Sequence, residues 1–300
     1  MKAVVLIAGP TASGKSGLAI QLAKQADGEV INADALQVYR DLRVISARPT
    51  HEDMQGVAHH LFGHIDGAHR YSTGQWVREA TALIIDIMAR GKLPIVAGGT
   101  GLYFKALIDG LAEVPPADSR AANNYFEKHG IAALRELAFS LDPKAAARVL
   151  GHDPQRLLRI VSVAQETDKP LSAWQADTKP VIPPGYWTSV LLLPPRELLY
   201  ERINQRFDGM VTQGGLAEVE ALAARNLASD LPVMRAIGAK TIIAHLVGEI
   251  SLDKGIELAK RDTRRFAKRQ MTWFRGQAAD WPTIVNQSDK SRFLADFKKL

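Results

Sequence analysis

The sequence predicts an α/β protein: a parallel sheet of the P-loop NTPase type with helices on both faces, plus an inserted all-helical subdomain. Three observations support this fold class. Strand-like and helix-like segments alternate through the first third of the chain, the strand-like segments are apolar throughout, and the first of them leads into a glycine-rich turn. Strands that are apolar on both faces are typical of parallel sheets, because helices cover both sides of such a sheet.

The elements of the core follow from apolar runs, helical periodicity and turn residues. The predicted strands are Ala3–Ala8, Val30–Ala33, Leu93–Ala97, Thr188–Leu193 and Thr283–Asn286. The predicted helices are Lys15–Gln25, Thr73–Ala89, Arg196–Arg225, Val233–Val247 and Leu252–Phe274. Right-handed crossovers should bring the loops that follow the strands to one edge of the sheet, where ligands bind in this fold class.

The pattern changes in residues 114–185. Helix-like stretches such as Ile131–Ala138 and Pro154–Gln165 dominate there, and little of the region has the character of a strand. Chain breakers stand at both ends, namely Pro115, Pro116, Pro180, Pro183, Pro184 and Gly185. We therefore predict that residues 1–113 and 186–300 form a P-loop core with basic C-terminal helices, and that residues 114–185 form the inserted helical subdomain.

Bulk composition restricts the function classes. The chain has 300 residues, 46% of them hydrophobic, which suffices for a sizeable core and excludes extensive disorder. No run approaches the ~18 apolar residues of a membrane span, so we expect no membrane partner. Cysteine is absent, which excludes disulfides, thiolate catalysis and zinc fingers and fits a cytoplasmic location. A formal net charge of +6 favours polyanionic partners.

One segment has the pattern of a P-loop, a glycine, four residues and then Gly-Lys-Ser. Its residues are Gly9, Pro10, Thr11, Ala12, Ser13, Gly14, Lys15 and Ser16. Glycines let backbone N–H groups converge on phosphate oxygens, and the N-terminus of the following helix favours an anion. Lys15 supplies a charge for the terminal phosphate, and the Ser16 hydroxyl can hold Mg²⁺. The pattern predicts polyphosphate binding without naming the ligand.

Most P-loops bind ATP or GTP, but two features argue against a plain nucleotide hydrolase. The third predicted strand ends in Gly98–Gly101, without the usual Walker B carboxylate, and no guanine-reading Asn-Lys-x-Asp segment occurs. Asp34 follows the second predicted strand and can take a proton from a nucleophile near the bound phosphates. These residues leave a small-molecule kinase and a group transferase open, with a nucleotide-gated RNA-binding protein as a third class.

Seven segments distinguish among these classes. They are Gly9–Ser16, Asp34–Arg40, Ala58–Leu61, Gly98–Lys105, Asp153–Arg159, Arg202–Met210 and Lys268–Arg275. In content and order they resemble the bacterial tRNA dimethylallyltransferases, also called tRNA isopentenyltransferases. The P-loop is common to many families, whereas GGTGLYFK and KRQMTWFR are far more particular.

The resemblance implies a reaction. The donor would be dimethylallyl diphosphate, held with Mg²⁺ in the P-loop, and the acceptor would be N6 of adenosine 37 of tRNA, next to the anticodon. Asp34 matches the family's catalytic aspartate, which takes a proton from the amine. Thr100 matches a residue that touches the target nucleotide or bound substrate, and Arg206 matches an arginine that faces the diphosphate.

The resemblance also implies contacts with the anticodon stem-loop. The matching residues are Asp34, Ala35, Leu36, Gln37 and Thr100 around the target base, Gln155, Arg156, Leu157, Leu158 and Arg159 in the insert, and Arg235, Lys240, Lys268, Arg269 and Arg275 elsewhere. Residues 259–275 carry seven basic residues and one acid, as expected for a helix that meets the RNA backbone. Gln37 is predicted to read the edge of the flipped base. We expect a monomer.

Five positions depart from the family pattern, and two of them, Ser46 and Arg48, keep the hydroxyl and the charge of the family's residues. Ala35 replaces a serine beside the catalytic aspartate, Ile45 replaces a glycine, and Lys240 replaces an arginine and so loses bidentate geometry. These departures concern RNA selectivity rather than the reacting groups. Five histidines lie between His51 and His69, but their spacing fits no zinc template.

Overall fold

The structure is a computed structural model that describes residues 4–167 and 169–297. The contacts between residues divide the structure into two compact units. The first unit runs to Phe104 and resumes at Ile182, and the second unit is Lys105–Val181. The predicted insert, residues 114–185, begins and ends later in the chain than this second unit.

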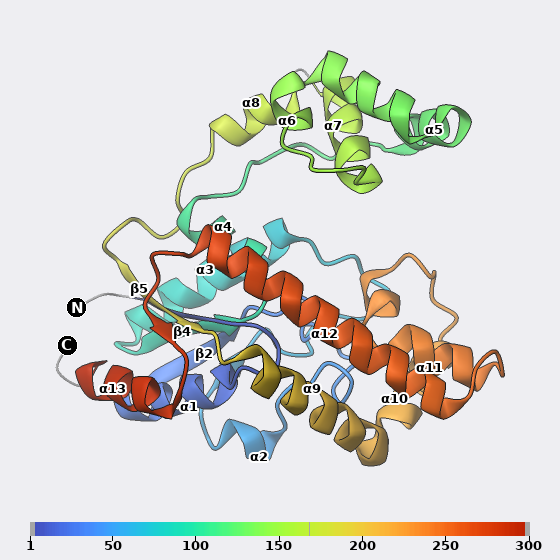
Figure 1. The fold of residues 1–300 in the computed structure, drawn as a ribbon. Coiled ribbons are helices and arrows are strands. Elements are labelled where there is room, and N and C mark those ends of the chain that lie inside the picture. The colour runs from blue at the N-terminus through green and yellow to red at the C-terminus, as the bar shows by residue number, and fades with distance from the viewer. Residues whose placement is uncertain (1–3, 168, 298–300) are drawn as a thin grey trace. The chain divides into compact units, whose positions relative to one another are not determined.

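A six-stranded sheet forms the core of the first unit, in the order β3-β2-β4-β1-β5-β6 (Figure 1). The strands are β1 Val4–Ala8, β2 Gly28–Asn32, β3 His59–His60, β4 Leu93–Gly98, β5 Trp187–Leu192 and β6 Thr283–Ile284. Every pairing between them is parallel. The central strand β1 is buried along its whole length, as its uninterrupted apolar sequence predicts. The predicted parallel α/β fold is confirmed, although Ala3, the first residue of the first predicted strand, lies outside the described residues.

Helices cover both faces of the sheet (Figure 1). α1 and α13 pack on one face, where Leu18 and Leu22 of α1 join Phe293 of α13 in one apolar cluster. α3 lies on the other face and begins at a capping box of Ser72 and Gln75. The helices of this unit are α1 Lys15–Ala26, α2 His51–Met54, α3 Thr73–Ala89, α4 Gly101–Ile108, α9 Arg196–Met210, α10 Leu216–Ala224, α11 Ala239–Leu246, α12 Leu252–Gln277 and α13 Gln287–Phe297, with the boundary to the second unit inside α4. No described helix combines the length and the apolar character needed to span a membrane.

Two predicted helices are wrong in one respect, because each is interrupted at glycine. The predicted helix 196–225 contains a π-helical segment, Val211–Gly215, in which Gly214 has a φ of 96°. The predicted helix 233–247 consists of a short 3₁₀ turn, Pro232–Arg235, and α11, separated at Gly238 with a φ of 94°. Glycine adopts such positive φ values without steric cost, so the regular helical conformation is interrupted at both glycines. The strand β3 was not predicted, because it has only two residues and both are histidines.

The second unit has helices as its only regular secondary structure in residues 105–167 and 169–181. They are the rest of α4, then α5 Arg120–Leu141, α6 Pro143–Ala146, α7 Pro154–Glu166 and α8 Leu171–Ala176. α5 bends at Gly130, where φ is 78°. Leu134 of α5 and Leu157 and Ile160 of α7 form the buried core between these two helices.

Candidate active site

The P-loop connects β1 to α1 at the carboxyl edge of the sheet. Gly14 has a φ of 92°, which glycine tolerates best. A side chain at Gly9 would lie 2.7 Å from the Leu192 carbonyl oxygen of the neighbouring strand β5. Both glycines are therefore required, one by backbone conformation and the other by close packing. The loop runs from Gly9 to Gly14, and Lys15 and Ser16 are the first two residues of α1.

Two cations of the site lack acidic partners. Lys15 Nζ donates a hydrogen bond to the Pro10 carbonyl at 3.3 Å, and Arg206 Nη2 donates to Thr11 Oγ1 at 2.5 Å. Neither side chain forms an ion pair with any described residue. Burial lowers the pKa of Lys15 to about 8; the Asp34 carboxylate opposes this shift and Arg206 adds to it. Burial likewise lowers the pKa of Arg206, with Asp34 acting in the opposite direction. Partly buried cations that form no ion pair indicate a site for an anion.

Asp34 follows β2 and is held by the buried side chain of Asn32. Asn32 Oδ1 accepts a hydrogen bond from the Asp34 N–H at 2.9 Å, and Asn32 Nδ2 donates to the Asp34 carbonyl at 3.0 Å. Asp34 Oδ1 accepts from the Leu36 N–H at 3.0 Å. No described residue donates to Asp34 Oδ2, so one carboxylate oxygen is available to a ligand. The carboxylate is thus fixed in position and still able to take a proton.

Thr100 follows β4 and connects its loop to the loop of Asp34. Its N–H donates to the Ala33 carbonyl, and its Oγ1 accepts from the Ala35 N–H, both at 3.0 Å. A side chain at Gly98 would lie 2.0 Å from the Ala33 carbonyl oxygen, so only glycine permits this approach. The structure therefore brings Thr100 and Asp34 together, as the shared edge of a parallel sheet predicts.

A pocket of about 300 Å³ lies in front of the P-loop. Its lining residues are Thr11, Ala12, Gly14, Lys15, Ser16, Asp34, Gln37, Ser46, Ala47, Arg202 and Arg206. Sequence reasoning did not assign Arg202, Ser46 and Ala47 to the site. Arg202 lies one helical turn before Arg206 on α9, and this i, i+4 spacing is the signal that could have identified it.

An apolar recess of about 60 Å³ adjoins this pocket and shares Thr11, Asp34, Ser46 and Arg206 with it. Its other lining residues are Leu36, Ile45, Ile203, Phe207, Met210, Ile237, Thr263 and Phe266. The Asp34 carboxylate and the Arg206 guanidinium therefore stand where the P-loop pocket meets the mainly apolar side chains of the recess. This arrangement suits a ligand with a charged head and a short hydrocarbon tail.

One wall of the pocket is formed by Ser46 and Ala47, at the end of the segment 43–47. Glu218 of α10 accepts hydrogen bonds from the N–H groups of Arg43, Val44 and Ile45 at 2.5, 2.9 and 2.8 Å. Gln37 Nε2 donates to the carbonyls of Ser46 and Ala47 at 3.0 and 2.9 Å. Both N–H groups of this amide are thereby used, so Gln37 Oε1 can only accept a hydrogen bond from a ligand.

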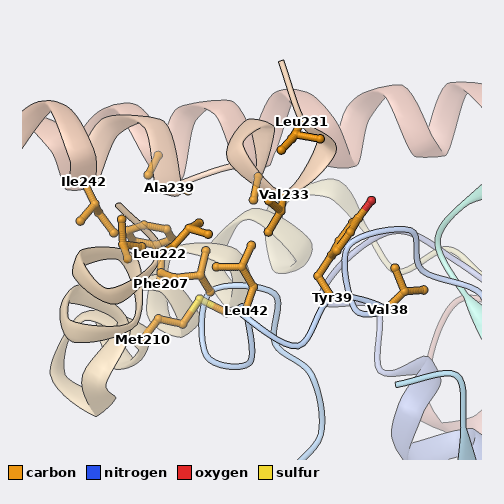
Figure 2. Close-up of a cluster of buried hydrophobic side chains, with 14 residues drawn as sticks. Val38, Tyr39, Leu42, Phe207, Met210, Leu222, Leu231, Val233, Ala239 and Ile242 are labelled. Carbon is orange, nitrogen blue, oxygen red and sulfur yellow. The ribbon is translucent and has the colours of Figure 1, made fainter. Parts of the chain in front are cut away.

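A buried apolar cluster lies behind this wall (Figure 2). In it Tyr39 and Leu42, from the segment after Asp34, pack with Phe207 and Met210 of α9 and with Leu222 of α10. The cluster fixes the segment after Asp34 against the helix that carries Arg206. Sequence periodicity did not predict this contact.

The remaining predicted RNA-binding residues lie apart from the pocket lining. Gln155, Arg156 and Arg159 are exposed on α7, whereas the Leu157 side chain is fully buried in the core of the second unit and Leu158 is half-buried. Exposed positions in the first unit are Arg235, Lys240, Lys268, Arg269 and Arg275. No group of three or more His, Asp or Glu residues in the described chain could hold a metal ion by itself.

Comparisons with known proteins place this site in a family. The model of a family described as IPP transferase matches residues 37–277, and a model described as isopentenyl transferase matches residues 2–62. The first match covers well over half of the chain. The chain belongs to the IPP transferase family. This membership favours group transfer over the kinase that the P-loop and Asp34 left open.

Relatives of this family match nearly the full chain. The tRNA dimethylallyltransferase of Maricaulis maris (strain MCS10) is 51% identical over 288 residues, covering 95% of this chain and 93% of that protein. The enzyme of the same name from Caulobacter sp. (strain K31) is 48% identical over 284 residues, covering 94% and 92%.

Solved structures of IPP transferases have the same fold. A eukaryotic dimethylallyltransferase acting on tRNA superposes with a TM-score of 0.80 at 30% identity, covering 91% of this chain and 70% of that one. The full-length tRNA isopentenylpyrophosphate transferase of Bacillus halodurans superposes with a TM-score of 0.70 at 32% identity, covering 100% and 95%.

Proposed function

We propose that this protein transfers the dimethylallyl group of dimethylallyl diphosphate to N6 of adenosine 37 of tRNA, next to the anticodon, and releases diphosphate. One observation carries the proposal. Two partly buried cations that form no ion pair with a described residue, Lys15 and Arg206, line the same pocket as a carboxylate with a free oxygen, Asp34. Family membership supplies the substrate class, and the pocket supplies groups that suit both substrates.

The diphosphate of the donor occupies the P-loop pocket. Lys15 and Arg206 neutralise the charge that grows on the bridging oxygen as the allylic C–O bond breaks, and the P-loop N–H groups face the same anion. The Ser16 hydroxyl lines the pocket and has no hydrogen-bond partner among the described residues, so it fits an oxygen ligand of Mg²⁺. When bound there with the diphosphate, Mg²⁺ supplies further neutralisation of the leaving group.

The five-carbon tail occupies the apolar recess. Ile203, Phe207 and Met210 line this recess and offer no hydrogen-bond partner to a hydrocarbon. Because Asp34 and Arg206 line both pockets, the reacting carbon atom lies between them. A tail that fills the recess displaces water, which would otherwise compete with the amine for the allylic carbon.

The acceptor amine reaches the same junction. As the N6–carbon bond forms and the carbon–oxygen bond breaks, the bond electrons leave with the diphosphate and the free oxygen of Asp34 takes a proton from N6. Gln37 Oε1 is an acceptor only, so it suits an exocyclic amine rather than a carbonyl. Thr100 Oγ1 already accepts from the Ala35 N–H, and its own hydroxyl proton remains for a contact with the nucleotide.

Adenosine 37 leaves its stack in the anticodon loop to reach this junction. Exposed basic residues contact the phosphates of the anticodon stem-loop, with Lys268, Arg269 and Arg275 on α12 and Arg156 and Arg159 on α7 as the main groups. The proposal needs only one copy of the chain, in keeping with the expected monomer. Its place of action is the cytoplasm, where it meets tRNA.

The test is a transfer reaction with Mg²⁺, dimethylallyl diphosphate and an unmodified tRNA that carries adenine at position 37. Mass spectrometry of the digested RNA is expected to find a five-carbon addition on adenosine. A matched tRNA with guanine at position 37 is the control and should gain nothing. Absence of the adduct from every tRNA with that adenine, together with ATP-dependent phosphorylation of a small molecule, would contradict the proposal and favour the kinase.

A further inference from the structure

A buried glutamine on α12 bridges two loops of the active site. Gln270 is only 6% exposed, and its Oε1 accepts a hydrogen bond from the Thr11 N–H at 2.9 Å. Its Nε2 donates to the Gly99 carbonyl at 2.9 Å. Thr11 belongs to the P-loop after β1, and Gly99 begins the loop after β4. One side-chain amide therefore joins the diphosphate loop to the loop of Thr100.

The orientation of this amide is determined by its partners. The Thr11 N–H needs an acceptor and the Gly99 carbonyl needs a donor, so only one flip of the amide satisfies both. An apolar side chain at position 270 would leave a buried donor and a buried acceptor without partners.

Glycines allow α12 to approach this loop closely. A side chain at Gly99 would lie 2.4 Å from Gln270 Nε2, and one at Gly101 would lie 2.3 Å from the ring of Trp273. The two α12 residues thus contact the backbone on either side of Thr100. The inner face of the helix holds this loop, while basic residues occupy its outer face.

Each loop held by Gln270 positions a reacting group. Thr11 Oγ1 accepts the hydrogen bond from Arg206, which faces the leaving group. Thr100 Oγ1 accepts from the N–H of Ala35, next to the base Asp34. Moving Thr11 relative to Gly99 would therefore move the diphosphate relative to the carboxylate.

We propose that Gln270 is a positioning residue that sets the spacing between the bound diphosphate and the Asp34–Thr100 pair. It touches neither substrate and acts through the backbone of the two loops. The inference rests on the proposed function for the identity of the diphosphate site. It adds a role for the inner face of α12 that differs from RNA binding by the outer face.

The test compares the full-length wild type with Gln270→Met, Gln270→Glu and a control, Gln277→Met. Methionine is similar in length to glutamine and removes both hydrogen bonds. Gln277 lies on the same helix, is exposed and has no hydrogen bond to a described residue, so it controls for the substitution itself. Inorganic pyrophosphate binding is measured with Mg²⁺ and without RNA, and transfer is measured separately at saturating RNA.

Gln270→Met is expected to bind pyrophosphate about tenfold more weakly and to lose a larger factor in kcat, because both the loop and its spacing to Asp34 change. The KM for tRNA and the behaviour of Gln277→Met should stay within about twofold of wild type. Gln270→Glu can still accept from Thr11 but repels the Gly99 carbonyl until its carboxyl is protonated. Its pyrophosphate affinity relative to wild type should therefore recover as the pH falls from about 8 to 6, since burial raises the pKa of a carboxyl.

Unchanged pyrophosphate affinity and kcat in a folded Gln270→Met protein would overturn the inference. So would a pyrophosphate affinity of Gln270→Glu that stays below the wild-type value by the same factor at every pH. If Gln270→Met fails to fold, the pH response of Gln270→Glu decides alone. Pyrophosphate binding that depends on Gln270, with no prenyl transfer in the wild type, would contradict the proposed function and leave the bridging role intact. A wild type that binds no pyrophosphate would overturn both.

Discussion

The two edges of the sheet use charge in opposite ways. At the amino edge, Glu29 of β2 is buried and receives two hydrogen bonds from Arg90, at 2.5 and 2.9 Å, and one contact from His60 at 2.7 Å. Lys92 lies 3.6 Å from the same carboxylate. At the carboxyl edge, Lys15 and Arg206 are partly buried and form no ion pair with a described residue.

The pKa values express this contrast. Hydrogen bonds from Arg90 are the main reason that the pKa of Glu29 falls to about 2, with burial opposing them and His60 assisting. The charged form of Glu29 is thus favoured by the fold. Burial lowers the pKa of Lys15 to about 8, so its charged form is disfavoured until an anion arrives. Charges that serve the fold are compensated within it, and charges that serve a ligand are left uncompensated.

The largest effect should follow from Asp34→Asn at the carboxyl edge. Loss of the proton acceptor is expected to lower kcat by roughly 10²- to 10⁴-fold. Binding of dimethylallyl diphosphate should hold or tighten, because a negative charge beside the diphosphate disappears. Quenched-flow transfer assays and calorimetry measure the two quantities. The exposed Asp280→Asn is the matched control, and an equal loss of activity in that variant would contradict the role of Asp34.

A smaller effect should appear in the pH dependence of donor binding. Because the pKa of Lys15 in the free protein is about 8, its cation is present below that pH and is lost above it. Affinity for dimethylallyl diphosphate should be constant from about pH 7 to 8 and then fall by up to about tenfold per pH unit. Calorimetry from pH 7 to 9.5 measures this decline. Lys15→Met should bind weakly throughout without the decline, and an identical pH profile in that variant would remove Lys15 as the cause.

Exposed arginines of the second unit are further cations that we expect to bind an anionic ligand, in this case the phosphates of tRNA. Arg156→Ala with Arg159→Ala should weaken tRNA binding about tenfold and reduce the slope of log affinity against log salt by about 1.5, as expected for two lost phosphate contacts. Turnover at saturating tRNA should not change. Arg120, exposed in the same unit and paired with Asp118 at 2.6 Å as Arg156 is with Asp153 at 3.3 Å, is the control. An equal loss in Arg120→Ala would mean that general charge, rather than these residues, binds the RNA.

The paired edge should affect stability and leave catalysis alone. Glu29→Gln is expected to lower the free energy of unfolding by about 1–3 kcal/mol at pH 7, because Arg90 loses its buried partner. The folded-state pKa of Glu29 is depressed, so its contribution is present above about pH 4.5 and is lost as the pH falls towards 2. Urea unfolding at pH 7 and 3.5 should show the variant approaching wild type at the lower pH. If Glu29→Gln had a lower kcat than the wild type at the same folded fraction, the proposal that the amino edge serves stability and the carboxyl edge serves catalysis would be wrong.

Sequence reasoning predicted the local parts of this molecule well. The P-loop is a contiguous segment whose residue order specifies its turn, and the apolar strand before it specifies its place in a parallel sheet. The meeting of Asp34 and Thr100 also follows from topology, because both residues come directly after parallel strands. The breaks at Gly214 and Gly238 had a signal in the sequence, since glycine inside a helical pattern often marks an interruption.

The walls of the site could not be predicted in this way. Gln270 and Thr11 are 259 positions apart, and Glu218 lies 173 positions from Ile45. Nothing in the local sequence of either residue indicates such a partner, because hydrogen bonds of this kind exist only after the chain has folded. The recess beside Arg206 likewise arises from the packing of α9 and α12 side chains that periodicity assigns only to a generic core. Phosphate binding is therefore encoded locally, whereas the placement of the acceptor against the donor is encoded by tertiary contacts.

The most direct test of the uncompensated-charge account is a crystal structure with a thiolodiphosphate analogue of the donor, in which sulfur replaces the bridging oxygen and prevents departure. The account predicts diphosphate oxygens within hydrogen-bonding distance of Lys15 Nζ and the Arg206 guanidinium, with the five-carbon tail between Phe207 and Met210. An analogue bound away from these two cations, or a tail directed into solvent, would contradict it.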